Sequence, residues 1–142
     1  MKNIRMLLTI TLLLAATAVC AQAQQQPMLK VTVPFAFTVE NIDLPAGSYI
    51  VYALPPLATT VKLVSADGRK SVFVRAIPSE GSTDATPARL LFSRIDNEYF
   101  LSQAWEERSK THLEFFLGNR AKELAKNRTH EQAKELVAVT AH

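Results

Sequence analysis

Residues 30–39 alternate between the two sides of an extended chain. One side carries an apolar residue at every second position, namely Val31, Val33, Phe35, Phe37 and Val39. Because successive side chains of a strand point to opposite faces, this pattern predicts a half-buried β-strand. Pro34 has no N–H group to donate to a sheet, so the strand either lies at an edge or bends there.

Turn residues separate this strand from the next one. Residues 41–47 are rich in turn formers, and Gly47 supplies the positive φ that a tight corner needs. A second strand is expected over residues 48–52, and Pro55-Pro56 is expected to end it.

Two β-hairpins are predicted in the middle of the chain. Their apolar runs and turns are 60–65 and 71–77 around Asp67-Gly68, and 89–95 and 98–105 around Asp96-Asn97. Asp, Asn and Gly accept the left-handed backbone of a two-residue hairpin turn. The polar residues 78–87 predict a loop, and the charged residues 106–111 predict an exposed segment.

The C-terminal part gives mixed signals. Asn119 is placed to cap a short helix over residues 120–127. The capping pattern of residues 129–132 permits a second helix. The alternation of Val137, Val139 and Ala141 favours a terminal strand instead, and this is our interpretation.

These elements predict a mainly β fold. We expect a compact antiparallel β-sandwich or open barrel of six to seven strands with a C-terminal helix. Residues 30–142 form a single β-rich domain in this interpretation, and no internal repeat is visible.

The N-terminus has the features of a secretory signal peptide. Lys2 and Arg5 precede an apolar run over residues 6–19, and Ala21-Gln22-Ala23 offers a small-x-small cleavage site. The run is shorter than the roughly 20 residues of a membrane-spanning helix. We therefore expect cleavage of residues 1–23, a flexible mature N-terminus over residues 24–29, and a periplasmic or secreted protein.

Two alternatives to this cleavage have weaker support. A lipid-carrying Cys20 normally follows Leu at the third position before it and Ala or Gly directly before it. Here Thr17 and Val19 occupy these positions. An uncleaved anchor fits poorly with the short apolar run and the cleavage site that follows it.

Composition narrows the possible chemistry of the mature chain. Cys20 is the only cysteine, so cleavage leaves no disulfide, cysteine-based metal site or cysteine nucleophile. The full chain has 16 Lys and Arg against 13 Asp and Glu, a net charge of +3, and loss of Lys2 and Arg5 lowers it to +1. This balance argues against a nucleic-acid partner, which requires clustered positive charge.

Four segments resemble a family of uncharacterised small exported proteins that recurs in acidobacterial genomes. The segments are Val33-Pro34-Phe35-Ala36-Phe37, Leu44-Pro45-Ala46-Gly47-Ser48-Tyr49, Ser65-Ala66-Asp67-Gly68 and Tyr99-Phe100-Leu101-Ser102-Gln103-Ala104-Trp105. The resemblance covers about residues 31–126. Its motifs are strand and turn motifs, so it implies a fold and carries over no activity, cofactor or catalytic residue.

Histidines give only a weak metal signal. The three are His112, His130 and His142, and no two have the spacing of a zinc pair on a helix. His112 and Glu114 share one face of a strand, but a metal site requires more ligands. Solvated surface histidines are the better interpretation, and we expect no metal and no cofactor.

No catalytic arrangement stands out. Ser109 and His112 are close in sequence, but no Gly-x-Ser-x-Gly elbow surrounds the serine. Glu106 and Glu107 are adjacent, so on a strand they point to opposite sides and cannot act as a pair. A hydrolase using Glu106, Glu107, His112 or Glu114 therefore ranks last. The sequon at Asn127 matters only in a eukaryotic secretory route.

Aromatic and basic side chains offer two further possibilities. The aromatic residues of the predicted strands are Phe35, Phe37, Tyr49, Tyr52, Phe73, Phe92, Tyr99, Phe100 and Trp105. They either fill the core, which we favour, or line a ligand cavity. The basic residues Lys62, Arg69, Lys70, Arg75, Arg89 and Arg94 form either an ordinary solvated sheet face, which we favour, or a face for anionic lipid or polysaccharide.

The leading functional hypothesis is an exported, non-enzymatic interaction or structural module. Its partner is an unknown protein or cell-envelope component, and pairing along the edge strand 30–39 is one possible mode. A small-ligand carrier with an aromatic-lined cavity is the alternative, and a hydrolase is the second alternative. The sequence contains no signal for the oligomeric state.

Overall fold

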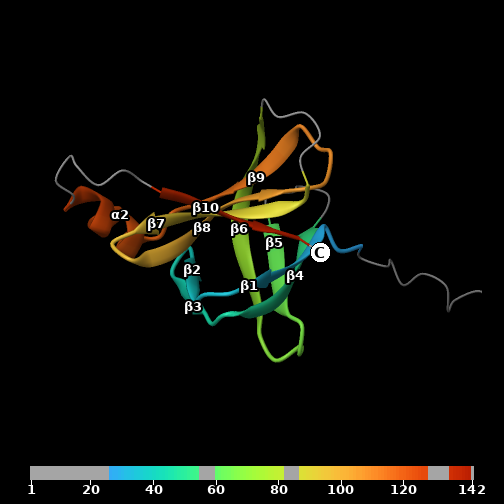
Figure 1. Ribbon diagram of the computed structural model, residues 1–142, viewed down its shortest axis with the longest axis horizontal. Helices are drawn as coiled ribbons and strands as arrows, with labels where there is room; N and C mark the ends of the chain where they lie inside the picture. The colour runs from blue at the N-terminus through green and yellow to red at the C-terminus, as the bar shows by residue number, and fades with distance from the viewer. Residues whose placement is uncertain (1–25, 55–59, 82–86, 128–134, 142) are drawn as a thin grey trace, which may run out of the picture.

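The computed structural model describes residues 26–54, 60–81, 87–127 and 135–141. The predicted signal peptide, the prolines at 55 and 56, the capping pattern at 129–132, His130 and His142 lie outside these residues. Figure 1 shows the strands curled around a common centre, with the short helix at one end.

Four strands form the first half of the sheet. They are β1 (Leu29–Val33), β4 (Gly47–Leu54), β5 (Thr60–Ser65) and β6 (Ser71–Glu80). Each pairs antiparallel with the next in the order β1-β4-β5-β6. Leu29 is already buried at the start of β1, within the segment expected to be a flexible N-terminus.

The remaining elements build the second half. They are β2 (Phe37–Val39), β3 (Ile42–Leu44), β7 (Arg89–Ile95), β8 (Glu98–Trp105), β9 (Thr111–Phe115), helix α2 (Asn119–Lys126) and β10 (Glu135–Thr140). The path continues from β6 through β9 and β8 to β2 and β3, while β7 joins the other edge of β8 and β10 pairs with β7.

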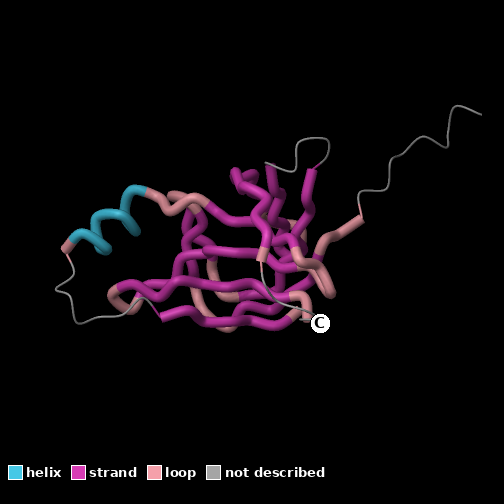
Figure 2. Tube along the Cα trace, turned by 90° about the horizontal axis from the view of Figure 1, so that it is seen from above, coloured by secondary structure: helices cyan, strands magenta, loops and turns pink. Residues whose placement is uncertain are grey.

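Strand β6 connects the two halves by changing its partner. Residues 71–75 pair with β5, and residues 76–80 pair with β9. The sheet curls until β1 packs against β10 and β7, although it remains an open sheet. In Figure 2 the strands enclose the interior and the helix projects beyond them.

The predicted mainly β fold with a C-terminal helix is confirmed. The described residues form ten strands, more than the six or seven that the pattern indicates. Two causes account for the difference. The expected strand over residues 30–39 breaks after Val33, because Pro34 interrupts the ladder and the chain bends. The expected turn over residues 41–47 contains the short strand β3.

Both predicted hairpins are confirmed. The first is the β5–β6 hairpin, in which Gly68 has φ +71°. The second is the β7–β8 hairpin, in which Asp96 and Asn97 have φ of 53° and 65°. The terminal strand is also confirmed as β10, antiparallel to β7. Strand β6 extends to Glu80, three residues beyond the predicted end at Ile77.

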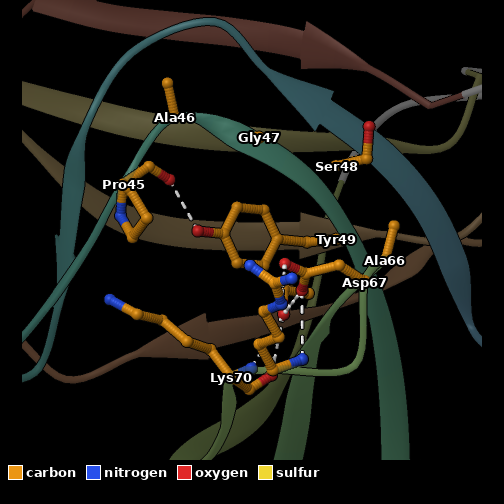
Figure 3. Close-up of a pocket in the computed structure, with 10 residues that line it drawn as sticks. Pro45, Ala46, Gly47, Ser48, Tyr49, Ala66, Asp67 and Lys70 are labelled. Atoms are coloured by element: carbon orange, nitrogen blue, oxygen red, sulfur yellow. Dashed lines mark hydrogen bonds and ion pairs between the residues drawn. The ribbon is translucent and has the colours of Figure 1, made fainter.

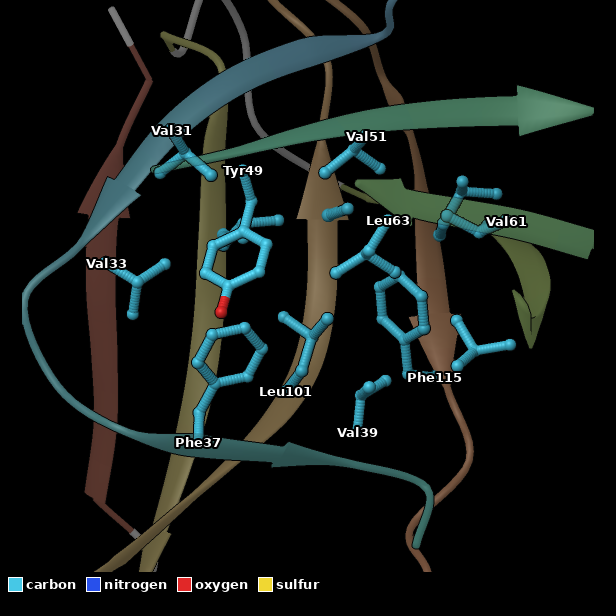
Figure 4. Close-up of a cluster of buried hydrophobic side chains, with 14 of the residues drawn as sticks. Val31, Val33, Phe37, Val39, Tyr49, Val51, Val61, Leu63, Leu101 and Phe115 are labelled. Atoms are coloured by element: carbon cyan, nitrogen blue, oxygen red, sulfur yellow. The ribbon is translucent and has the colours of Figure 1, made fainter. Parts of the chain in front are cut away.

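Apolar side chains from both halves meet in the interior. Figure 4 shows Val31 and Val33 of β1 facing Phe37, while Val51, Val61 and Leu63 approach from the neighbouring strands. Aromatic rings contact one another within this core: the Phe37 ring lies 5.3 Å from the Tyr49 ring and 5.2 Å from the Phe92 ring, both in edge-on geometry.

Helix α2 is capped differently from the sequence prediction. Asn119 was expected to cap it, but the N-cap is Gly118, which has no side chain to donate or accept. The side chain of Asn41 accepts a hydrogen bond from the Asn119 N–H at 2.9 Å instead. A Cβ atom on Gly118 would lie 1.6 Å from the Glu40 carbonyl oxygen, so only glycine permits this close approach.

The docked helix covers the outer side of β7 and β8 at the end where Ile95 and Phe100 lie. Phe100 and Ile95 point away from the main core and form a second cluster with Ala121 of the helix. Leu117 and Leu124 pack against this cluster. The helix therefore removes from water an apolar patch that the sheet alone leaves exposed.

Candidate functional site

The outward side chains of the first half of the sheet form an apolar surface that we call the outer β4–β6 face. Its members are Ile50, Tyr52, Leu54, Lys62, Val64, Phe73, Arg75 and Ile77, together with Phe116 directly after β9. Phe73, Ile77 and Phe116 are 59%, 48% and 43% exposed. Clustered large apolar side chains at such exposure mark interaction sites on soluble proteins.

Strand register places a lysine between two aromatic residues on this face. Lys62 lies opposite Tyr52 of β4 on one side and opposite Phe73 of β6 on the other. Its Nζ atom is 5.7 Å from the centre of the Phe73 ring, within the range of a cation–π contact. The ammonium group therefore lies directly beside the most exposed aromatic ring.

Arg75 makes a similar contact at the boundary with β9. Its guanidinium carbon lies 5.5 Å from the centre of the Phe116 ring. Glu40, in the β2–β3 turn, accepts the Arg75 backbone N–H at 2.8 Å and lies 3.9 Å from the Arg75 Nε. Because the arginine side chain is mostly exposed, this ion pair contributes little stability and leaves the cation accessible.

The hollow beside Tyr49 lies next to this face at the turn of the β5–β6 hairpin. It has a volume of about 410 Å³, and the chain from Pro45 to Tyr49 forms one wall. Figure 3 shows the Tyr49 hydroxyl directed at the Pro45 carbonyl, to which it donates at 2.6 Å, and Lys70 extending along the opposite wall. The walls combine apolar surface with the charges of Asp67, Arg69 and Lys70.

Two ionisable groups in this hollow have shifted pKa values. Burial raises the pKa of Tyr49, and the negative charge of Asp67 adds to the effect. The hydrogen bond from the Ser65 hydroxyl lowers the pKa of Asp67, assisted by the Arg69 backbone N–H. Asp67 therefore stays ionised and fixes the hairpin turn, and is not a candidate proton donor near neutral pH.

The predicted solvated position of His112 is wrong. The side chain is buried, and its ring stacks on Trp105 with centres 4.2 Å apart. Its Nε2 atom lies 3.2 Å from the Glu114 carboxylate, while Nδ1 is buried without a hydrogen-bond partner. The cross-strand pair of Trp105 and His112 explains the burial, because the indole covers the imidazole.

Two residues of the hydrolase hypothesis, Glu106 and His112, border one hollow. They line a space of about 260 Å³ together with Ser109, the serine that lies close to His112 in sequence. The Ser109 hydroxyl donates to the Thr111 carbonyl at 2.9 Å and also accepts the Thr111 N–H. It is therefore engaged by the backbone of its own turn, whereas a nucleophilic serine requires a hydrogen bond to its base.

The remaining candidates of this hypothesis do not complete a catalytic arrangement. Glu114 contacts His112, but Glu107 forms an exposed ion pair with Arg108 at 3.5 Å. Within the described parts of the chain, no group of three or more His, Cys, Asp or Glu residues gathers in a way that fits a metal ion.

Most of the predicted aromatic residues pack within the protein. Phe35 stacks on Tyr99 at 3.9 Å and meets Phe92 edge-on at 5.1 Å. Trp105 lies over Gly81, where a Cβ atom would approach the indole to 2.2 Å. Phe73 and Tyr52 differ from these, because Phe73 points outward from β6 and Tyr52 points outward from β4.

The six basic residues do not form one face. Lys62 and Arg75 belong to the outer β4–β6 face, and Arg69 and Lys70 border the hollow beside Tyr49. The other two lie on β7, where the Arg89 guanidinium contacts the Trp105 ring and the Arg94 guanidinium contacts the Tyr99 ring.

Sequence reasoning missed the apolar members of the outer β4–β6 face. Ile77 and Phe116 were not singled out, and Phe73 was assigned to the core. One signal was available: β6 carries apolar residues at both parities, with Val72 and Val74 inward and Phe73 and Ile77 outward. A strand apolar on both sides indicates that its outer side is also covered, by its own chain or by a partner.

No family model, curated protein or solved structure matches this chain. In the described ranges, no helix combines the length and apolar character needed to cross a membrane. The structure thus defines a mainly β protein with one open sheet and an exposed apolar and basic face.

Proposed function

We propose that this chain is an exported, non-enzymatic interaction module that binds a cell-envelope component through the outer β4–β6 face. The observation that supports this proposal is the exposure of Phe73 and Ile77 on the outer side of β6, together with that of Phe116, whose ring Arg75 of the same strand contacts. Apolar residues on the outer side of β7 and β8 are covered by helix α2, whereas these three have no such cover among the described residues.

The experiment compares envelope retention in the native host. A tagged chain carrying Phe73→Ser and Ile77→Ser is expressed beside the wild type and beside Ile42→Ser, which changes a partly exposed residue at the edge strand β3. After mild crosslinking, the wild type and the control should remain with the envelope fraction, and the double variant should be lost from it. Equal retention of all three would contradict the proposal.

The strand-addition mode has less support from the geometry. It requires an open backbone edge at β1. Strand β1 ends the strand order with β4 as its hydrogen-bonded neighbour, but β10 and β7 pack close to it. Light scattering over a range of concentrations tests it, because self-association by strand pairing produces dimers or larger species. A monomer at every concentration would remove this mode and leave the face-mediated mode intact.

The carrier alternative is favoured by one observation, the hollow beside Tyr49. Its volume of about 410 Å³ suits a small molecule, but Tyr49 is its only aromatic wall. A carrier would therefore hold a ligand with an apolar body and an anionic group near Arg69 and Lys70. A screen of aromatic carboxylates by protein NMR tests it, with the Lys70→Ala variant as the matched control.

Export itself is part of the proposal. The expected mature chain begins at Gln24 and is soluble in the periplasm or outside the cell. Mass spectrometry of the protein from the host's exported fraction should find Gln24 as the first residue. A diacylated Cys20 would indicate a tethered lipoprotein, and an intact Met1 in the membrane fraction would indicate an anchor. The proposed family membership rests on the resemblance of its strand and turn segments.

A further inference from the structure

We infer that the partner of the outer β4–β6 face is an anionic phospholipid surface, a proposal that rests on the function proposed above. The protein then binds peripherally, with Phe73, Ile77 and Phe116 entering the headgroup boundary and Lys62 and Arg75 meeting the lipid phosphates. Charge, side-chain chemistry and the size of the face support this assignment.

Positive and negative charges are distributed unevenly over the face. Strands β1, β4, β5 and β6 carry three basic residues, Lys30, Lys62 and Arg75, and their only acidic residue is Glu80 at the end of β6. Two further carboxylates approach from other elements: Glu40 lies beside Arg75, and the half-exposed Glu114 of β9 lies across from Ile77. The carboxylates therefore gather toward β9, whereas the part of the face around Lys62 is positive and complements an anionic surface.

The apolar residues favour lipid over a polysaccharide. The face carries the aromatic residues Tyr52, Phe73 and Phe116, on which sugars could stack. It also carries Ile50, Leu54 and Ile77, which are branched aliphatic residues without a planar surface for a sugar. Aromatic and aliphatic side chains beside lysine and arginine are typical of proteins that lie in the lipid interface. The charged ends of Lys62 and Arg75 lie over the Phe73 and Phe116 rings, and the long stems allow these ends to reach headgroup level.

The size of the face favours a membrane over a protein partner. Three strands about 4.8 Å apart and 8, 6 and 10 residues long present roughly 300–500 Å². A stable protein interface needs about 800 Å² from each partner. A bilayer has no such threshold, because binding strength grows with the apolar area inserted and with each cation near the headgroups.

The experiment measures binding of the processed exported chain to vesicles. Vesicles contain phosphatidylcholine alone or with 30% phosphatidylglycerol, at low and at high salt, and bound protein is measured after flotation. We expect binding to the anionic vesicles at low salt, and at least about a fivefold weaker partition for Lys62→Glu, since one cation near the surface contributes about this factor. The control Lys122→Glu makes the same charge change on the exposed side of helix α2 and should bind like wild type.

A second pair of variants tests the apolar part. Phe73→Ser should weaken partition into anionic vesicles, while Ile42→Ser on β3 should not. Far-UV circular dichroism and unfolding curves verify that each variant is folded. Equal binding of Lys62→Glu and Lys122→Glu, or no binding by the folded wild type, would overturn the inference.

Failure of this inference and failure of the proposed function have different signatures. If the wild type ignores vesicles but the Phe73→Ser/Ile77→Ser variant still leaves the host envelope fraction, the face binds a protein or polysaccharide and only the lipid assignment is wrong. If the double variant is also retained in the host, the proposed function fails as well.

Discussion

The two outer sides of the sheet carry similar apolar residues but differ in how far these residues are exposed. On β7 and β8, Phe100 is 2% exposed because helix α2 packs over it. On β6, Phe73 is 59% exposed, and a lysine is its closest charged neighbour. The chain thus builds a cover for one apolar side, and the described residues leave the other open, as expected if its cover is another molecule.

The largest expected effect separates these two phenylalanines. Phe100→Ala should lower the free energy of unfolding by about 3–5 kcal/mol, because it removes a buried ring and leaves a cavity beneath the helix. Phe73→Ala should change it by less than about 1 kcal/mol, since its ring is largely in water already. Urea unfolding followed by Trp105 fluorescence measures both. Similar decreases in the free energy of unfolding for the two variants would show that Phe73 contributes to the core.

The position of helix α2 over the outer side of β7 and β8 depends on Gly118. Gly118→Ala should lower the free energy of unfolding by about 1–3 kcal/mol, because the new Cβ atom would overlap the Glu40 carbonyl and displace the helix. The same unfolding assay applies, and NMR should show shifts at Phe100 and Ala121. An unchanged stability together with unchanged spectra would mean that the helix is not held by this close approach.

A smaller effect is expected at the cap of the helix. Asn41→Ala should lower the free energy of unfolding by about 1 kcal/mol, because the Asn119 N–H loses its acceptor. Asn119→Ala is the matched control and should be nearly neutral, since the Asn119 side chain makes no capping hydrogen bond. The opposite ranking in thermal unfolding would restore Asn119 as the cap.

The smallest effect concerns the open side at the hairpin turn. The Asp67 pKa is lowered in the folded protein, so the carboxylate favours folding above its unfolded pKa and loses this contribution as the pH falls through the folded value. Ser65→Ala should move the Asp67 pKa back toward its usual range. Carboxyl-carbon NMR titration measures it, and an unchanged pKa would show that the serine is not its main partner.

Local patterns predicted the hairpins because their information is local. Asp96 and Asn97 tolerate positive φ, and Gly68 favours it, so the turn positions follow from the residues themselves. The break at Pro34 was anticipated for the same reason. Extra strands such as β3 escaped prediction because three residues are too few to show a period of two.

Features that depend on distant residues were not predictable. Asn41 caps a helix that begins 78 residues later, and no local signal relates the two positions. His112 is buried because β8 brings Trp105 across from it. For the candidate face, the pattern identified β6 as a strand. It did not identify the outer side, because Val74 and Phe73 are both apolar and point to opposite sides.

The contact between Asn41 and Asn119 also has a consequence for how the chain folds. Contacts between residues far apart in sequence form slowly, because the entropy of closing a long loop is lost before the contact stabilises the chain. We therefore expect the hairpins to form first and the helix to dock late. Until that step, both outer sides display apolar rings, and newly synthesised chains are most prone to aggregate during this interval.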